Sequence, residues 1–111
     1  MTVEQLTQAL RQFAAERDWE QFHTPKNLAM AVAGEAGELV AELQWLTPEE
    51  SAALDADTLA AVSAEMADVL IYLCRLADVL GVDLLAAAEE KVVRNRERYS
   101  IERARGNAEK W

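Results

Sequence analysis

Apolar residues recur along most of the chain at spacings of three and four, which is the period of an amphipathic α-helix. The first such stretch contains Val3, Leu6, Leu10 and Phe13. Thr2, with Gln5 three residues later, is a capping signal for this helix, which we expect to run to about Arg17. Residues 18–23, with the sequence DWEQFH, interrupt the period and predict a loop.

A second helix is predicted from Thr24, which caps it, and Pro25, which occupies its first turn. The periodic pattern continues to about Trp45. Thr47 and Pro48 repeat the same signal for a short turn, and residues 51–57 form a connector. The connections between the helices are therefore short.

Two more helices complete the predicted fold. Asp57 is the expected N-cap of the third, which ends at Gly81. The apolar stripe expected to form its core face comprises Val62, Met66, Val69, Leu70, Leu73, Leu76 and Leu80. Asp83 caps a fourth helix that runs to about Tyr99. Residues 101–111 are polar and contain Gly106, so residues 1–100 are expected to form the domain and 101–111 a mobile tail.

The fold class that follows is all-α, a four-helix bundle. Leu84, Leu85, Ala88 and Val92 face one side of the fourth helix, and Val93 faces another. Because 111 residues bury only a modest core, we expect oligomerisation, as a dimer or larger assembly, to complete it.

Charge narrows the possible partners. The formal net charge is −9 and the sequence pI is about 4.5, which argues against binding to a nucleic-acid polymer or an anionic membrane surface.

The first ten residues lack the basic and apolar regions of a signal peptide, and no apolar run is long enough to span a membrane. The single cysteine, Cys74, excludes an internal disulfide and is expected in the core. A cytoplasmic location is expected.

Two pairs of carboxylates carry the candidate chemistry. Glu35 and Glu38 in the second helix, and Glu65 and Asp68 in the third, are each three residues apart and share a helix face. Glu35 lies on the same stripe as Leu28, Val32, Leu39 and Leu43. Acids among apolar residues need a positive partner, yet neither motif contains Lys or Arg.

A divalent cation would supply that partner. A single acid pair of this kind is usually an ordinary solvated one, but two such pairs among apolar residues on consecutive helices favour the metal ion. Oxygen ligands without His or Cys favour Mg²⁺, with Mn²⁺ as a substitute, over zinc. A di-iron bundle normally uses Glu-x-x-His pairs, whereas the one histidine, His23, lies in the predicted loop. Gly34 and Gly37 lower helix propensity, and we interpret them as sites of close approach by another helix or a ligand.

A basic stripe on the fourth helix fits the oxygens of a phosphate. It comprises Lys91, Asn95, Arg98 and Tyr99. Cationic and amide donors next to a magnesium site would share the negative charge of a polyphosphate between them. The same residues are also typical of a solvated basic helix end that interacts with the helix dipole.

Aromatic residues near the loops are candidates for holding a nucleobase. Trp19 and Phe22 precede the second helix, and Trp45 follows it. Packing of the loops onto the bundle would explain them equally well. His23, Lys26 and Asn27 follow closely and are candidates for binding phosphate or base, while His23 also fits a hydrogen bond within the loop.

Three segments in this order resemble the MazG-type nucleotide pyrophosphohydrolases, and most closely their all-α dCTP pyrophosphatase branch. The segments are RDWEQFHTPKNLAMAVAGEAGELVAELQW, EMADVLIYLCRLADVLGVDL and KVVRNRERY. The resemblance covers about Leu6 to Tyr99 and leaves the residues after Tyr99 unmatched.

The resemblance implies Mg²⁺-dependent cleavage of a nucleoside triphosphate between the α and β phosphates, with removal of non-standard or excess nucleotides as the role. It implies that Glu35, Glu38, Glu65 and Asp68 bind the metal and that Trp19 and Trp45 surround the base, with one of the four carboxylates as the general base, for which we favour Glu38. It assigns the remaining contacts near the nucleotide to Tyr72, Lys91, Asn95, Arg98 and Tyr99. It also implies a helical homodimer or homotetramer.

Two alternatives remain at this point. dUTP or phosphoribosyl-ATP would be hydrolysed on similar acidic helix pairs, although Trp19 and Trp45 favour a pyrimidine deoxynucleotide through the resemblance. A helical adaptor without catalytic activity would instead use the acidic surface for protein contacts.

Overall fold

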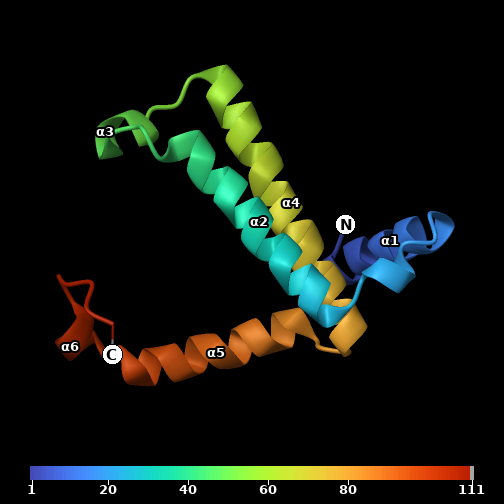
Figure 1. Cartoon of the computed structure of the whole chain (residues 1–111). Helices are drawn as coiled ribbons and strands as arrows, with labels where there is room; N and C mark the ends of the chain where they lie inside the picture. The colour runs from blue at the N-terminus through green and yellow to red at the C-terminus, as the bar shows by residue number, and fades with distance from the viewer. Residues whose placement is uncertain (111) are drawn as a thin grey trace. The chain divides into compact units, whose positions relative to one another are not determined.

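The computed structural model describes residues 1–110, which contain helices and no β-strand. The chain forms two compact units, Met1–Gly81 and Val82–Trp111. The first unit contains α1 (Val3–Glu16), the 3₁₀ turn η1 (Glu20–Phe22), α2 (Pro25–Leu43), α3 (Pro48–Ser51) and α4 (Ala56–Leu80). The second contains α5 (Leu84–Arg98) and α6 (Ile101–Ala104) (Figure 1). The all-α prediction and its four long helices are confirmed. Among the described helices, none is both long and apolar enough to cross a membrane.

Capping residues begin the helices of the first unit largely where the sequence predicts. Thr2 and Gln5 form a complete capping box at α1. The hydroxyl oxygen of Thr24 accepts a hydrogen bond from the backbone N–H of Asn27 at the start of α2. Thr47 caps the short helix α3 in the same way. The predicted loop at residues 18–23 contains the single turn η1.

The N-cap predicted for α4 is wrong by two residues. Asp55 is the cap, and its Oδ1 accepts a hydrogen bond from the backbone N–H of Thr58 at 2.7 Å. Asp57 instead lies within the first turn, where the positive end of the helix dipole still stabilises its negative charge. Gly81 ends the helix as predicted, and its φ of 70° is a left-handed conformation that glycine adopts without steric cost.

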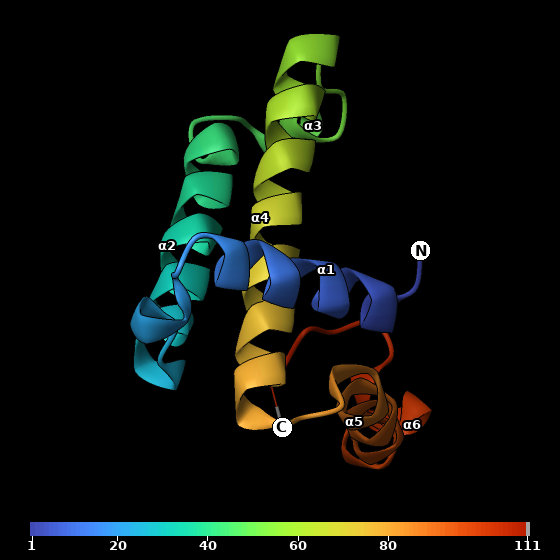
Figure 2. The same ribbon diagram turned by 90° about the vertical axis from the view of Figure 1, so that its right-hand side faces the viewer.

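The first unit is built on α2 and α4, which lie side by side and antiparallel, while α1 packs across α4 (Figures 1 and 2). Its buried apolar residues are few, namely Ala14, Leu28, Val62, Cys74 and Ala77. Cys74 is a core residue, as predicted. This small core brings the carboxylate-bearing helices together.

Part of the predicted core stripe of α4 is not buried within this chain. Val62 is buried, but Met66, Leu70 and Leu80 are exposed, Met66 to 57%. A Cβ built at Gly34 or Gly37 would meet nothing within 4 Å. The close approach predicted at these glycines is therefore not made by any part of the chain that the structure describes.

The second unit consists of α5 and one further helical turn. Asp83 caps α5, its Oδ1 accepting a hydrogen bond from the backbone N–H of Ala86, as predicted. The residues expected to form a mobile tail begin with α6. Trp111, the last residue of that predicted tail, lies outside the described residues. The boundary between domain and tail stays a prediction.

Candidate functional site

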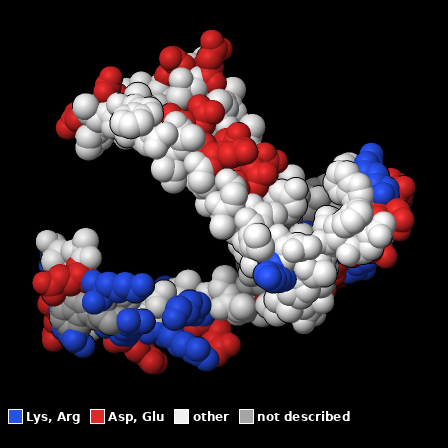
Figure 3. All heavy atoms as spheres, in the orientation of Figure 1, with Lys and Arg blue, Asp and Glu red and all other residues white. Residues whose placement is uncertain are grey.

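Three of the four predicted metal-binding carboxylates meet between α2 and α4. Glu35 and Glu38 come from α2 and Glu65 from α4, and one carboxylate oxygen of each lies within 4.8 Å of those of the other two. The i, i+3 spacing turns both α2 carboxylates toward the neighbouring helix. Acidic side chains gather over these two helices on the face drawn in Figure 3.

The cluster is under-satisfied in hydrogen bonds. Oε2 of Glu35 and Oε2 of Glu65 are both buried, and neither has a hydrogen-bond partner among the described residues. A buried carboxylate oxygen without a donor or a cation is unfavourable, because the water that solvated it has been lost and nothing replaces it. A bound cation would supply the partner that these two oxygens lack.

The pKa values of the two half-buried glutamates reflect the same imbalance. Burial, together with hydrogen bonding to Glu38 and the charges of Glu38, Asp68 and Glu35, raises the pKa of Glu65 from 4.5 to about 7. Burial, and then the charges of Glu38 and Asp68, also raise the pKa of Glu35. Below about pH 7, Glu65 thus holds a proton that a cation would displace.

Asp68 takes part in the cluster through its charge. It is half-buried one turn after Glu65, and its carboxylate raises the pKa values of both Glu35 and Glu65. It is not among the three residues whose oxygens lie within 4.8 Å of one another. The donors are all carboxylate oxygens, which suits a hard dication such as Mg²⁺ or Mn²⁺ better than zinc. The residues fit such an ion.

The aromatic residues predicted to contact the nucleotide lie at different places in the first unit and differ in their exposure. Trp19 is 41% exposed at the start of η1 and packs edge-on against Phe13, with ring centroids 5.6 Å apart. Trp45 is 88% exposed just beyond the end of α2. Tyr72 is half-buried on α4, one turn after Asp68.

The polar candidates around the start of α2 have partners within the chain. Nδ1 of His23 accepts a hydrogen bond from Nε of Arg75 at 3.0 Å. The side-chain amide of Asn27 donates to the carbonyl oxygen of Phe22 at 3.0 Å. Lys26 is exposed in the first turn of α2. His23 and Asn27 thus shape the loop, the alternative that the sequence already allowed for His23.

The basic stripe lies in the second unit. Lys91, Asn95 and Arg98 belong to α5, and Tyr99 follows its last residue. The guanidinium of Arg98 lies 5.6 Å from the centre of the Tyr99 ring. The four residues of the basic stripe therefore follow one another along a single helix and its C-cap residue, as the sequence predicts.

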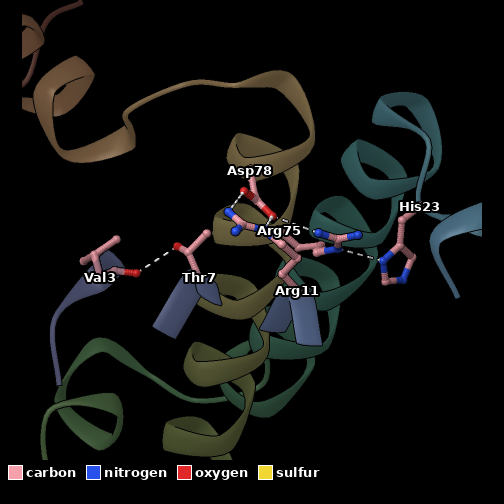
Figure 4. Close-up of polar contacts among 6 residues, drawn as sticks. All are labelled: Val3, Thr7, Arg11, His23, Arg75 and Asp78. Atoms are coloured by element: carbon pink, nitrogen blue, oxygen red, sulfur yellow. Dashed lines mark hydrogen bonds and ion pairs between the residues drawn. The ribbon is translucent and has the colours of Figure 1, made fainter. Parts of the chain in front are cut away.

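Sequence reasoning missed a polar network at the other end of α4. Arg75 and Asp78 on α4 form an ion pair, and Arg11 from α1 binds the same Asp78 carboxylate (Figure 4). Arg75 is only 7% exposed. The signal was an arginine within the apolar run LCRLA, where a charge needs buried partners.

Fold and site together define an all-α protein in which two antiparallel helices present acid pairs suited to a divalent metal ion. The sequence profile of the MazG-like family matches residues 31–111. The chain belongs to the MazG-like family, and the resemblance noted in its sequence is confirmed.

Curated relatives and a solved structure agree with this assignment. The chain is 45% identical to dCTP pyrophosphatase 1 of Rattus norvegicus and 44% identical to that of Homo sapiens, in each case over 112 aligned positions. Each alignment covers 99% of this chain and 66% of the relative, so the chain spans about two thirds of its relatives' length. The crystal structure of a pyrophosphatase from Archaeoglobus fulgidus is similar with a TM-score of 0.79 and 36% identity, covering 87% of this chain and 91% of that one.

Proposed function

We propose that this chain is a Mg²⁺-dependent pyrophosphohydrolase that cleaves dCTP, or dCTP with a modified base, to the monophosphate and pyrophosphate. The observation that carries the proposal is the pair of buried carboxylate oxygens of Glu35 and Glu65 that have no donor. The names of the mammalian relatives and of the similar archaeal structure support release of pyrophosphate as the reaction. The names of the mammalian relatives also support cytosine as the base of the substrate. The cellular role would be removal of non-standard or excess nucleotides.

Glu35, Glu38, Glu65 and Asp68 would hold the metal ion, Mg²⁺ or Mn²⁺ in its place. When bound, the ion offsets the negative charge of the triphosphate and makes water a better nucleophile. Support comes from the meeting of three of these carboxylates and from the raised pKa values of Glu35 and Glu65. The excess negative charge of the cluster would thereby be neutralised.

Glu38 is the proposed general base. It is exposed, whereas Glu35 and Glu65 are each half-buried with one oxygen shielded. An exposed carboxylate can accept the proton of a water molecule that attacks the α-phosphorus. A bond then forms between that water oxygen and the α-phosphorus, and the bond to the α–β bridging oxygen breaks so that pyrophosphate leaves.

Other side chains are proposed to bind and orient the nucleotide. Trp19 and Trp45 carry exposed ring surface that suits a pyrimidine base. The donors proposed for the triphosphate and sugar are Tyr72, Lys91, Asn95, Arg98 and Tyr99. Lys26, Asn27 and His23 border the loop that carries Trp19.

A homodimer or homotetramer is part of the proposal. Leu59, Met66 and Leu70 are all exposed on α4, at spacings of seven and four that keep them near one face. Exposed apolar residues on one face are typical of an interface between subunits. The nucleotide substrate and the single buried, unpaired Cys74 fit a cytoplasmic location.

The test is a substrate panel with pyrophosphate detection, run with Mg²⁺ and with EDTA. It contains dCTP, 5-methyl-dCTP, dUTP, the other deoxynucleoside triphosphates and phosphoribosyl-ATP. Metal-dependent pyrophosphate release that is fastest with a cytosine nucleotide is the expected result. Preference for dUTP or phosphoribosyl-ATP would reassign the substrate, and no release from any member would leave a non-catalytic adaptor.

A further inference from the structure

Arg75 is a buried cation that joins two parts of the first unit. Its Nε donates to Nδ1 of His23 at 3.0 Å, and its Nη1 donates to Oδ2 of Asp78 at 2.9 Å (Figure 4). The planar guanidinium directs these two bonds apart, which the single head of a lysine does not do. Arg75 thereby connects the loop before α2 to the C-terminal half of α4.

The charges around Arg75 allow its burial. Asp78 compensates it directly, and Arg11 holds the same carboxylate through Nε at 3.0 Å and Nη2 at 2.6 Å. His23 accepts through Nδ1, so it is neutral with its proton on Nε2. Burial, together with the charge of Arg75, lowers the pKa of His23. The hydrogen bond from Arg75 to His23 is therefore maintained at neutral pH.

The loop that carries Trp19 is otherwise held by local hydrogen bonds. The backbone N–H of Trp19 donates to Ala14 of α1, and Asn27 of α2 donates to Phe22. The ring of Trp19 lies edge-on to that of His23, with centroids 6.2 Å apart. Among the hydrogen bonds described for this loop, the one from Arg75 to His23 connects it to α4.

The helix that holds the loop also bears half of the acidic cluster. Glu65, Asp68, Tyr72 and Arg75 follow one another on α4 at spacings of three, four and three. These spacings keep them on one stripe of the helix. Arg75 lies seven residues after Asp68, which is about 10 Å along the axis. A rigid helix thus relates the aromatic loop to the carboxylates.

We infer that Arg75 is a positioning residue for substrate binding, which acts through His23 to hold Trp19 at a set distance from the carboxylates on α2 and α4. This inference rests on the proposed function, in which Trp19 contacts the base. It assigns to His23 a role in orienting the loop rather than contact with the nucleotide. Loss of the bond would weaken substrate binding and leave the carboxylates that act on the phosphates in place.

Fluorine NMR of the full chain labelled with 5-fluorotryptophan tests the loop directly and without activity. The resonance of Trp19 is assigned from its loss in Trp19→Phe. In Arg75→Met we expect this resonance to shift or broaden while that of Trp45 is unchanged. Arg11→Met is the matched control, because it removes an arginine from Asp78 and leaves the Arg75–His23 bond intact. An unchanged Trp19 resonance in folded Arg75→Met would overturn the inference.

Kinetics test the consequence for the substrate. Because stacking of an aromatic ring on a base contributes substantially to binding, KM for the preferred nucleotide should rise roughly 5- to 20-fold in Arg75→Met, with kcat changed less than about twofold. Arg75→Lys, which keeps the charge but only one donor nitrogen, should give a smaller rise in KM. A fall in kcat at constant KM contradicts the inference.

A double-mutant cycle separates positioning from direct contact. If both residues act through their shared bond, His23→Leu should raise KM about as much as Arg75→Met, and the double variant no further. If the KM of the double variant instead rises by the product of the two single effects, His23 binds the nucleotide itself and the inference is wrong. His23→Leu leaves the Arg75–Asp78 pair in place, so it serves even where Arg75→Met does not fold.

The failure of this inference and that of the proposed function are distinguishable. A wild-type chain that hydrolyses no nucleoside triphosphate refutes the proposed function and, with it, the substrate-binding role of Arg75. An active wild type together with an Arg75→Met variant of unchanged KM refutes the inference alone.

Discussion

Glu35 on α2 and Glu65 on α4 are thirty residues apart in the sequence, yet each buries one carboxylate oxygen in the same cluster without a hydrogen-bond partner. This arrangement is unfavourable for the isolated chain and favourable once a dication joins it. The same two helices would therefore be drawn together by the ion that the proposed reaction needs.

Removing one carboxylate should abolish turnover without unfolding the protein. We expect Glu35→Gln and Asp68→Asn each to lower kcat/KM by about 100-fold or more, because the metal ion loses a charged ligand. Glu42→Gln, an exposed change on α2 outside the cluster, is the matched control and should keep full activity. Circular dichroism checks that the helices remain, and full activity of Glu35→Gln or Asp68→Asn would refute the site.

The affinity for a divalent ion should rise with pH up to about 7. Glu65 has its pKa raised to about 7, so below that pH a proton occupies a group that the metal ion needs. Titration calorimetry with Mn²⁺ between pH 5.5 and 8 measures this slope. Glu65→Gln should bind more weakly and with a shallower slope, and an affinity for the wild-type chain that is independent of pH would contradict the prediction.

The same group should affect the stability of the metal-free chain with a definite sign. The pKa of Glu65 is 4.5 when unfolded and about 7 when folded, so the folded state retains a proton that the unfolded state releases. The free energy of unfolding attributable to Glu65 therefore falls as pH rises from about 4.5 to 7 and is constant above. In EDTA, the Tm of Glu65→Gln relative to wild type should increase over this interval. A constant difference would contradict the raised pKa.

Metal and nucleotide together should stabilise a true binding protein against heat. At a free ligand concentration 100 times Kd, mass action adds about 2.7 kcal/mol to the free energy of unfolding. For a chain of this size, that corresponds to a rise in Tm of roughly 10 °C or more. Scanning fluorimetry with Mg²⁺ and a non-hydrolysable dCTP analogue measures it, with EDTA as the control. No shift would favour the adaptor alternative.

The start of α4 offers a test of the corrected cap. Asp55→Ala should lower the free energy of unfolding by about 1 kcal/mol, since the N–H of Thr58 loses its acceptor. Asp57→Ala should cost less, because its favourable charge near the helix terminus contributes only a few tenths of a kcal/mol at an exposed site. Urea denaturation of both variants compares them, and equal losses would contradict the assignment of the cap.

Sequence patterns predicted the local structure well because its causes are local. The helix at Thr2 and the stop at Gly81 follow from hydrogen bonds and backbone freedom within a few residues. The paired acids of α2 were also evident, since i, i+3 spacing defines a helix face. The cap at Asp57 was wrong because Asp55, two residues earlier, competes for the same role and the pattern alone does not rank them.

By itself, the sequence determined an all-α chain, the ends of most of its helices and the acid pairs on two of them. Only the tertiary structure decided that Glu35, Glu38 and Glu65 converge, and that Arg75 reaches His23 across 52 positions of the chain. The reason is that helix period and capping act over a few residues, whereas these contacts depend on which helices pack together. Burial then raises the pKa of Glu65 and makes the Arg75 charge dependent on Asp78.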